Sequence, residues 1–414
     1  MNIQMNNEQE NAINSIMQGK DVILLGAAGT GKSTVISEAI ESLEKKGLQV
    51  RICAPTGTAA RIVQGRTVHN LFDYQIGVRP RNYERTTVSA DIEQADAIIV
   101  DEVSMVRVDL MEWLIKDAKQ KKKPAQLILC GDYKQLQPVI SSREKIAFKK
   151  QWGGQSRLGY AFDSNEYKRL DVSIIHLTEP MRQKADRRFF DALSRIGNGD
   201  YGGVVEIMER CSREEFEDAI YLYPRKSQVE EKNLQKLKEI KKREYIYSAK
   251  VIDDSFLEEM QQPKTLRLKE GCRVMSLVNE ANGAYFNGSL GTIISCEKDH
   301  VVVRFDETEG VYEIGEYEYK WPVYNSAGEV DGEKIMGYHL PLTLAYATTH
   351  HKCQGQTYSR ANIAPQCFTG GELYTVLTRV RDVCNMHLLS RIRRSDLIVP
   401  KDVRNYYRQL ELCC

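Results

Sequence analysis

The chain has 414 residues, of which 42% are hydrophobic and 28% charged, and its 58 Lys and Arg nearly balance 57 Asp and Glu. This composition excludes a disordered chain and a nucleic-acid coat protein that binds through overall positive charge. We expect a soluble globular protein of two or three domains, because a domain takes roughly 150 residues. No apolar run approaches the roughly 18 residues of a membrane span, and the polar start excludes a cleaved signal or a transit peptide.

The ten cysteines indicate free thiols in a reducing compartment. None forms a C-x-x-C pair, no Cys and His group has zinc-ligand spacing, and several lie in apolar runs such as 127–130. We therefore expect no zinc and no structural metal. The expected location is cytoplasmic, at the nucleoid in a prokaryote, and the sequence leaves a nuclear or viral compartment open.

The first 175 residues alternate strand-like apolar runs with helical patterns, which predicts βαβ units and a parallel sheet. A helix is expected at 34–46, and residues 73–93 break the pattern as a small insertion. The predicted strands are followed by Gly, Pro, Asp or Glu, where an open α/β sheet places its ligands. These strands are 22–25, 50–54, 97–100 and 127–130.

The run GAAGTGKS at 26–33 fits the phosphate-binding pattern G-x-x-x-x-G-K-[ST]. Its glycines free backbone N–H groups to cradle phosphates, Lys32 would reach the β- and γ-phosphates, and the Ser33 hydroxyl would hold Mg²⁺. The run follows a predicted strand and opens a predicted helix, which is the setting that this motif requires. The candidates for ATP binding are Gly26, Ala27, Gly29, Thr30, Gly31, Lys32, Ser33 and Thr34.

The run AIIVDEVSM at 97–105 ends a buried strand with two adjacent carboxylates. Asp101 would orient Mg²⁺ and its waters, and Glu102 would polarise the attacking water. Asp-Glu pairs are common on protein surfaces, but an apolar strand downstream of a phosphate-binding loop favours the catalytic interpretation. Glu102 also favours hydrolysis of ATP over phosphoryl transfer to a bound small molecule.

The rest of the chain changes character twice. Residues 178–259 are mostly helical, 265–337 are short β-type runs separated by turn signals such as Asn-Gly, and strand-and-helix patterning returns from 338. The predicted division is an α/β domain at 1–175, a second α/β domain in two parts at 176–262 and 338–414, and a small all-β insertion at 263–337.

Seven further runs, with the two described above, resemble the motifs of superfamily 1 helicases and come in the order of that family. They are NNEQENAI (6–13), APTGTAARIV (54–63), RTVHNLF (66–72), LILCGDYKQLQPV (127–139), LTEPMRQ (177–183), ATTHHKCQGQT (347–357) and ELYTVLTRVRD (372–382). The resemblance implies that Gln9 recognises adenine and that Gln135 senses the γ-phosphate. It also implies that Arg182 and Arg379 are γ-phosphate arginines and that Gly355 lies at the nucleotide.

Within that superfamily, HKCQGQT at 351–357 and the all-β insertion before it are similar to the five-prime-to-three-prime group, which includes PIF and RecD-type helicases. This resemblance implies two RecA-like α/β domains with parallel sheets and an SH3-like module at 263–337. Three stretches depart from the PIF pattern. KKKPAQLILCGD stands in place of an FGG stretch, Arg225-Lys226 in place of Thr-Asn, and Glu372 in place of Gln.

The resemblance also implies a track for single-stranded DNA. Hydroxyls, amides and scattered basic side chains suit phosphate contacts that form and release without reading sequence. The candidates are Pro55, Thr56, Thr67, His69, Asn233, His351, Lys352 and Gln354. Phe72, Tyr74 and Tyr83 could stack on bases, but we expect them to pack in the core. The insertion at 73–93 is a candidate for the element that splits the duplex.

These patterns predict an ATP-dependent helicase that moves along single-stranded DNA, five-prime to three-prime as the resemblance implies, and unwinds forked or partial-duplex DNA. It would act as a monomer or a weak DNA-induced dimer. An RNA helicase of the same superfamily remains open, because nothing in the sequence identifies a reader of the 2′-hydroxyl. A P-loop kinase explains 26–33 but not the later motifs. A non-motor ATP switch would not need Lys32, Glu102, Gln135, Arg182 and Arg379 together.

Overall fold

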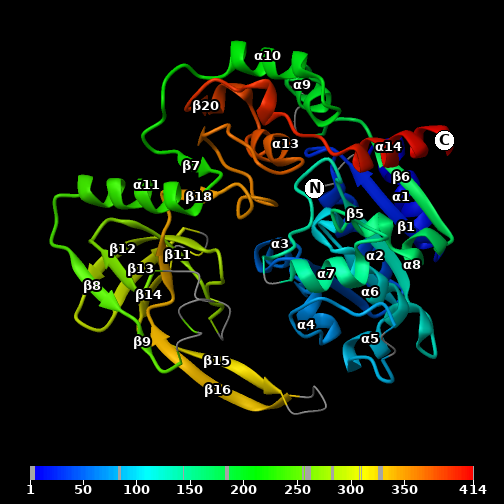
Figure 1. The fold of residues 1–414 in the computed structure, drawn as a ribbon, viewed down its shortest axis with the longest axis horizontal. Helices are drawn as coiled ribbons and strands as arrows, with labels where there is room; N and C mark the ends of the chain where they lie inside the picture. Colours follow the sequence, from blue (N-terminus) through cyan, green and yellow to red (C-terminus); the bar gives the residue numbers. More distant parts are fainter. Residues whose placement is uncertain are drawn as a thin grey trace. The chain divides into compact units, whose positions relative to one another are not determined.

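A computed structural model of the chain describes all residues except 1–4, 83–84, 143, 182–185, 254–255, 257–262, 281–283, 307, 309, 325–329 and 414. The chain forms two compact units (Figure 1). One unit contains Met1–Pro224 together with His350–Cys414, and the other is Arg225–Thr349. Among the described residues, no helix is both long and apolar enough to cross a membrane.

The first unit contains a sheet of six parallel strands in the order β3-β2-β4-β5-β1-β6. Its central strands β1, β4 and β5 are buried on both faces, which explains their continuous apolar runs. Along β1, Ile23 and Leu25 join one buried cluster and Val22 and Leu24 join another. The strands are β1 (Asp21–Gly26), β2 (Val50–Ala54), β3 (Arg66–Thr67), β4 (Ala97–Val100), β5 (Gln126–Gly131) and β6 (Val172–Leu177).

Helices cover both faces of this sheet. On one face pack α1 (Asn7–Met17) and α2 (Lys32–Lys45), whose buried residues Val35, Ile36, Ala39 and Leu43 form one helical stripe. The other face is covered by residues of several shorter helices and of α6. These are α4 (Val68–Phe72), α5 (Ala90–Gln94), α6 (Val108–Gln120), α8 (Asn165–Arg169) and, from the end of the chain, α14 (Lys401–Cys413). The remaining helices here are α3 (Gly57–Ile62) and α7 (Lys145–Trp152).

The insertion at 73–93 is bonded to its neighbours at several of its described residues. Arg107 donates to the carbonyl of Gly77 at 2.8 Å, Trp113 donates to that of Pro80 at 3.1 Å, and Asp109 accepts from the backbone N–H of Arg79 at 2.8 Å. Phe72 and Tyr74 are buried, which confirms their expected place in the core, while Tyr83 lies outside the described residues.

A second parallel sheet lies in the C-terminal part of the first unit. It contains β7 (Ile220–Tyr223), β19 (Ala361–Ile363) and β20 (Met386–Leu388), and both pairings that β19 makes are parallel. A separate buried cluster joins it to α9 (Arg187–Gly197), α10 (Tyr201–Arg210) and α13 (Glu372–Leu377). The predicted α/β fold with two parallel sheets is therefore confirmed.

The second unit is mainly antiparallel and has its own core. Its five-stranded sheet runs β14-β13-β12-β11-β17, beside the hairpin of β15 (Tyr317–Tyr324) and β16 (Val330–His339). The other elements are α11 (Lys226–Glu239), β8 (Tyr245–Ser248), β9 (Lys250–Val251), β10 (Thr265–Leu268), β11 (Arg273–Ser276), β12 (Leu290–Cys296), β13 (Val301–Phe305), β14 (Val311–Ile314), β17 (Leu342–Leu344) and β18 (Ala347–Thr349).

The predicted β insertion at 263–337 lies within this unit, which begins earlier and ends later. The mostly helical expectation for 178–259 is wrong at three places, because β7, β8 and β9 fall inside it. Two of these strands are the short aromatic runs IYLY and YIYS, which suit a pleated surface but are too brief to stand out between charged helices.

Candidate active site

The phosphate-binding loop connects β1 to α2 and requires glycine at two left-handed positions. Gly29 has a φ of 91° and Gly31 a φ of 87°. A Cβ atom at Gly31 would lie 2.2 Å from Nε2 of Gln9, so Gln9 would have to move to admit a side chain there. Lys32 folds back over this loop, and its Nζ donates to the carbonyl oxygens of Gly26 at 2.8 Å and Ala27 at 3.2 Å.

Two segments distant in sequence meet this loop. Gln9, fully buried in α1, donates to the carbonyl of Thr30 at 3.3 Å. The Met181 N–H donates to the carbonyl of Gly29 at 2.8 Å. The predicted adenine-recognising residue thus lies at the phosphate loop. Arg182, which follows Met181 in the chain, lies outside the described residues.

Asp101 and Glu102 follow β4, as predicted. Glu102 has a φ of 51° and a ψ of 44°, a left-handed conformation that costs a non-glycine residue about 1–2 kcal/mol and is often found at functional sites. Both residues keep some exposed surface, but neighbouring atoms crowd their carboxyl groups. Burial raises the pKa of Asp101, although the charge of Lys32 opposes the shift. Burial and the charge of Asp101 raise the pKa of Glu102, against Arg379 and Lys32.

The C-terminal part of the same unit reaches this site with two side chains. Arg379 is 4% exposed, and its Nη2 donates to Oε1 of Gln135 at 3.3 Å. Gln354 is 3% exposed, and its Nε2 donates to Oε2 of Glu102 at 3.2 Å and to Oγ of Ser104 at 3.3 Å. The structure therefore joins Arg379 to Gln135, both predicted for ATP hydrolysis, across more than 200 positions of sequence.

Gln354 was predicted to contact DNA, and in the structure it lies at Glu102. Its amide is buried against the candidate catalytic carboxylate, and no described group bonds its buried Oε1. Gly355, which was predicted at the nucleotide, has a φ of 81° and lies beside Glu102. The segment 347–357 therefore reaches the hydrolytic site.

Asn233, which was also predicted to contact DNA, is bonded within its own unit. The residue is 6% exposed, and its Oδ1 accepts from the N–H groups of Tyr346 at 3.0 Å and Ala347 at 2.9 Å. Its Nδ2 donates to the carbonyl of Leu344 at 3.3 Å. These bonds hold α11 to the chain that follows β17.

The other candidates for nucleic-acid contact remain near the surface. Thr56 and Thr67 are N-caps that accept from Ala59 N and Asn70 N, each at 3.2 Å, so their hydroxyl hydrogens can still donate to a phosphate. Burial lowers the pKa of His69 and of His351, which favours neutral rings at pH 7. The remaining two are Pro55, which is half-buried, and Lys352, which is exposed.

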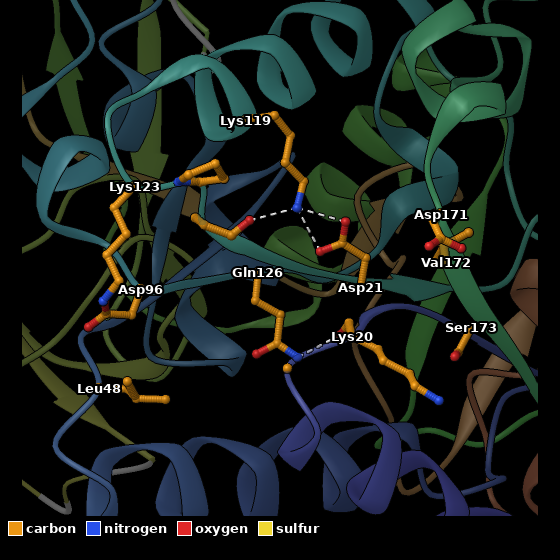
Figure 2. A pocket seen from close by; sticks show the side chains of 13 residues that line it. Lys20, Asp21, Leu48, Asp96, Lys119, Lys123, Gln126, Asp171, Val172 and Ser173 are labelled. Atoms are coloured by element: carbon orange, nitrogen blue, oxygen red, sulfur yellow. Dashed lines mark hydrogen bonds and ion pairs between the residues drawn. The ribbon is translucent and has the colours of Figure 1, made fainter.

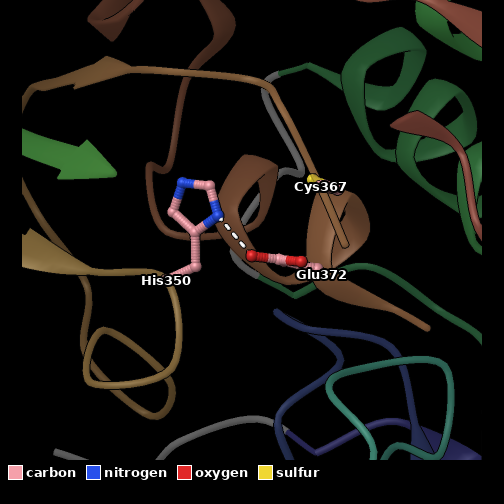
Figure 3. Close-up of side chains that lie close together, drawn as sticks. All are labelled: His350, Cys367 and Glu372. Atoms are coloured by element: carbon pink, nitrogen blue, oxygen red, sulfur yellow. Dashed lines mark hydrogen bonds and ion pairs between the residues drawn. The ribbon is translucent and has the colours of Figure 1, made fainter. Parts of the chain in front are cut away.

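His350, Cys367 and Glu372 form a buried group whose ligand atoms lie within 4.8 Å of one another (Figure 3). Most of these atoms already have partners, but the buried Nε2 of His350 has none in the part of the chain that the structure describes. Nδ1 of His350 bonds Glu372 at 2.9 Å, the other carboxylate oxygen accepts from Phe368 N at 2.6 Å, and the Cys367 thiol donates to the carbonyl of Pro365 at 3.3 Å. Burial would raise the pKa of Glu372, but the bond from His350 and the backbone N–H groups lower it. Glu372 thus anchors α13 to the segment that carries Gln354.

A cavity of about 690 Å³ lies at the amino ends of the strands of the six-stranded sheet, opposite the phosphate loop (Figure 2). It is lined by the first residues of β1, β5 and β6, whereas the phosphate loop follows the end of β1. Lys119 is paired with Asp21 at 2.7 Å and Lys123 with Asp96. These pairs join α6 and the following loop to the sheet, and the cavity is remote from the residues predicted for ATP.

The sequence prediction missed three residues beside Gln135. Asp132 is 1% exposed, and its carboxylate accepts from the hydroxyls of Tyr374 at 2.8 Å and Tyr407 at 3.2 Å. The available signal was an Asp directly after the strand in LILCGD. Its partners lie more than 240 residues later, and nothing local identifies them.

A family model described as an AAA domain matches residues 4–144. The ATP-dependent DNA helicase Pif1 of Bdellovibrio bacteriovorus is 29% identical over 99% of this chain and 93% of its own length. The human ATP-dependent DNA helicase PIF1 is 27% identical over 93% of this chain, which spans about three fifths (61%) of the human protein. Pif1 helicase from Bacteroides, solved with ADP-AlF3 and ssDNA, is similar with a TM-score of 0.83 and 27% identity, covering 99% of this chain and 98% of its own.

Proposed function

We propose that this chain, which belongs to the Pif1-like helicases of superfamily 1, is an ATP-dependent DNA helicase that moves along single-stranded DNA and unwinds duplexes. One arrangement carries the proposal. Arg379 and Gln354, from the part of the unit that holds the second parallel sheet, bond Gln135 and Glu102, from the part that holds the first. Such contacts suit an ATPase in which hydrolysis changes how two lobes meet.

In this proposal each polar group of the site has a task in hydrolysis. The backbone N–H groups of 26–33 bind the phosphates of ATP, and Lys32 exchanges its two carbonyl partners for a phosphate. Glu102 orients the attacking water, while Gln135 and Arg379 stabilise negative charge on the γ-phosphate. Arg182, for which the resemblance implies a contact with the γ-phosphate, would add a second guanidinium.

Mg²⁺ fits the donor set formed by Ser33 and Asp101, since a hydroxyl and a carboxylate offer the oxygen ligands that this ion prefers. When bound, the ion would neutralise charge on the phosphates. Burial of Asp101 beside Lys32 supports this assignment, because a buried carboxylate is most stable next to a cation.

The proposed DNA track runs over Pro55, Thr56, Thr67, His69, His351 and Lys352. The exposed Lys352 lies two residues from Gln354, so nucleic acid bound there would act close to the partner of Glu102. We expect movement five-prime to three-prime on forked or partial-duplex DNA, by a monomer or a weak DNA-induced dimer. The expected location is the cytoplasm, at the nucleoid in a prokaryote.

The proposal is tested by measuring steady-state ATP hydrolysis under three conditions: without nucleic acid, with single-stranded DNA and with single-stranded RNA. Lys32→Ala serves as the inactive control. We expect DNA to stimulate hydrolysis strongly and Lys32→Ala to abolish this activity. Unwinding of forks of both polarities then gives the direction of movement along the strand. Stimulation by RNA alone would make the chain an RNA helicase. Equal rates under all three conditions would overturn a translocating motor and favour a P-loop kinase.

A further inference from the structure

A buried carboxylate lies at the centre of the contact between the two parallel-sheet halves of the first unit. Asp132 follows β5 directly and is 1% exposed. Its Oδ2 accepts from the Tyr374 hydroxyl at 2.8 Å, and its Oδ1 accepts from the Tyr407 hydroxyl at 3.2 Å and from Lys134 N at 3.0 Å. Burial raises the pKa of both tyrosines, which keeps their hydroxyls protonated as donors. Such donors are what a buried carboxylate requires.

Asp132 opens the short segment that ends at Leu136 and contains Gln135. The backbone N–H of Leu136 donates to Oγ1 of Thr375 at 2.9 Å, and Gln135 accepts from Arg379 at 3.3 Å. Thr375, like Tyr374, belongs to α13, and Arg379 follows that helix. The segment 132–136 is therefore held at three points by α13 and the residues after it.

A fourth support comes from α14, a helix outside all the helicase-like motifs. The Tyr407 hydroxyl donates to Asp132 and accepts from Tyr133 N at 3.2 Å, and Nζ of Lys134 lies 4.8 Å from the centre of the Tyr407 ring. The neighbouring Tyr406 does not bond Asp132, although its ring packs edge-on against that of Tyr133 at 5.2 Å. Its ring stacks on Phe162 at 4.5 Å, and its hydroxyl bonds that of Tyr167 at 2.7 Å.

We propose that Tyr407 is a positioning residue for ATP hydrolysis, through which α14 braces Asp132 and fixes where Gln135 and Arg379 meet the terminal phosphate of ATP. The inference rests on the proposed ATPase function. The tyrosine does not touch the nucleotide, and its effect passes through the carboxylate of Asp132. Loss of its hydroxyl leaves Oδ1 of Asp132 with the N–H of Lys134 and frees one end of the segment 132–136.

The test compares Tyr407→Phe with Tyr406→Phe in the full chain, with saturating single-stranded DNA. Each variant loses one buried hydroxyl from the same helix and keeps its ring, but only Tyr407 contacts Asp132. We expect kcat to fall about tenfold in Tyr407→Phe, with KM for ATP within twofold of wild type, because the phosphate loop is unchanged. Tyr406→Phe should keep the wild-type kcat. Equal kcat values in the two variants, at temperatures where both are folded, would overturn the inference.

A double variant separates positioning from general weakening. If Tyr407 acts through Asp132, adding Tyr407→Phe to Asp132→Asn should lower kcat less than twofold further, since the two changes affect one contact. A further tenfold fall would show that Tyr407 acts by another route and would contradict the inference. An inactive wild-type enzyme would instead refute the proposed function, so the two failures are distinguishable.

Discussion

At the scale of single residues, Glu102 combines three features that rarely occur together by chance. It is left-handed without being glycine, its carboxyl pKa is raised by burial and by Asp101, and its Oε2 accepts from a buried amide. Backbone strain of this kind persists when the surrounding structure enforces it and the side chain is needed where it points. Glu102 is therefore the residue whose replacement should separate hydrolysis from binding.

We expect Glu102→Gln to lower kcat for ATP hydrolysis about 10²- to 10⁴-fold, the usual contribution of a general base. Binding of a fluorescent ATP analogue should stay within a few-fold of wild type, because the amide has nearly the same shape and leaves the phosphate loop intact. Steady-state hydrolysis and fluorescence titration measure the two effects. A variant that hydrolyses ATP within tenfold of wild type would assign the base to another group.

A glycine pair offers a second test at this scale. Gly31→Ala should raise KM for ATP at least tenfold, because the new Cβ would lie 2.2 Å from Nε2 of Gln9 and disturb the loop. Gly19→Ala is the matched control. The φ of Gly19 is 78°, also left-handed, so alanine there has a similar strain of about 1 kcal/mol. Nothing lies within 4 Å of the added Cβ atom. Similar KM values in the two variants would mean that contact with Gln9 does not shape the nucleotide site.

At the scale of elements, the insertion at 73–93 is part of the first unit's framework and not a detachable loop. Tyr74 and Ile92 belong to the buried cluster that also contains residues of α6, and several backbone groups of the insertion are bonded by Arg107, Asp109 and Trp113. Deleting the whole insertion would therefore damage the core. Its role in duplex separation must be tested at its exposed surface.

Ile76 provides that surface, since it is 92% exposed beside the anchored Gly77. If the insertion splits the duplex, Ile76→Asp should slow unwinding of a forked substrate several-fold and leave ATP hydrolysis stimulated by single-stranded DNA unchanged. Ile146→Asp, at an 83% exposed position on α7, serves as the control for added charge. Stopped-flow unwinding measures the rates, and equal unwinding by both variants would rule out Ile76 as the separating residue.

At the scale of the whole molecule, the two compact units have separate cores. The cluster that includes Val274, Val303 and Phe305 lies within Arg225–Thr349, and the described residues proposed for the nucleotide site lie in the other unit. A unit with its own core can unfold as its own cooperative transition. Ligands of the nucleotide site should therefore stabilise the two units differently.

Differential scanning calorimetry of the full chain should show two transitions. ADP with Mg²⁺ at about 100 times its Kd should stabilise the unit of Met1–Pro224 and His350–Cys414 by about 2.7 kcal/mol and leave the other transition in place. Lys32→Ala, measured at the same ADP concentration, is the control for binding at the phosphate loop. A single transition that shifts as a whole would show that the units unfold together.

Local patterns explain why much of this site was accessible from sequence. Lys32, Asp101, Glu102 and Gln135 each follow or lie just beyond the end of a predicted parallel strand, and strand ends on one edge of a sheet must converge. The partners of Gln354 and Asn233 could not be predicted, because tertiary packing sets them. One amide meets Glu102 and the other meets the backbone of Tyr346 and Ala347. Asp132 was missed for the same reason.

The position of α14 has a consequence for how the protein is made. Val403 and Tyr407 belong to the buried cluster of the first sheet, which also contains Tyr133 and Phe162 from much earlier in the chain. A ribosome releases the strands of that sheet long before it adds these two residues. The nascent N-terminal lobe therefore exposes an incomplete apolar face until the second unit and the second sheet have been synthesised. Its final packing should be a late event in biosynthesis, and a chaperone that shields this aromatic surface would have most to bind just before α14 emerges.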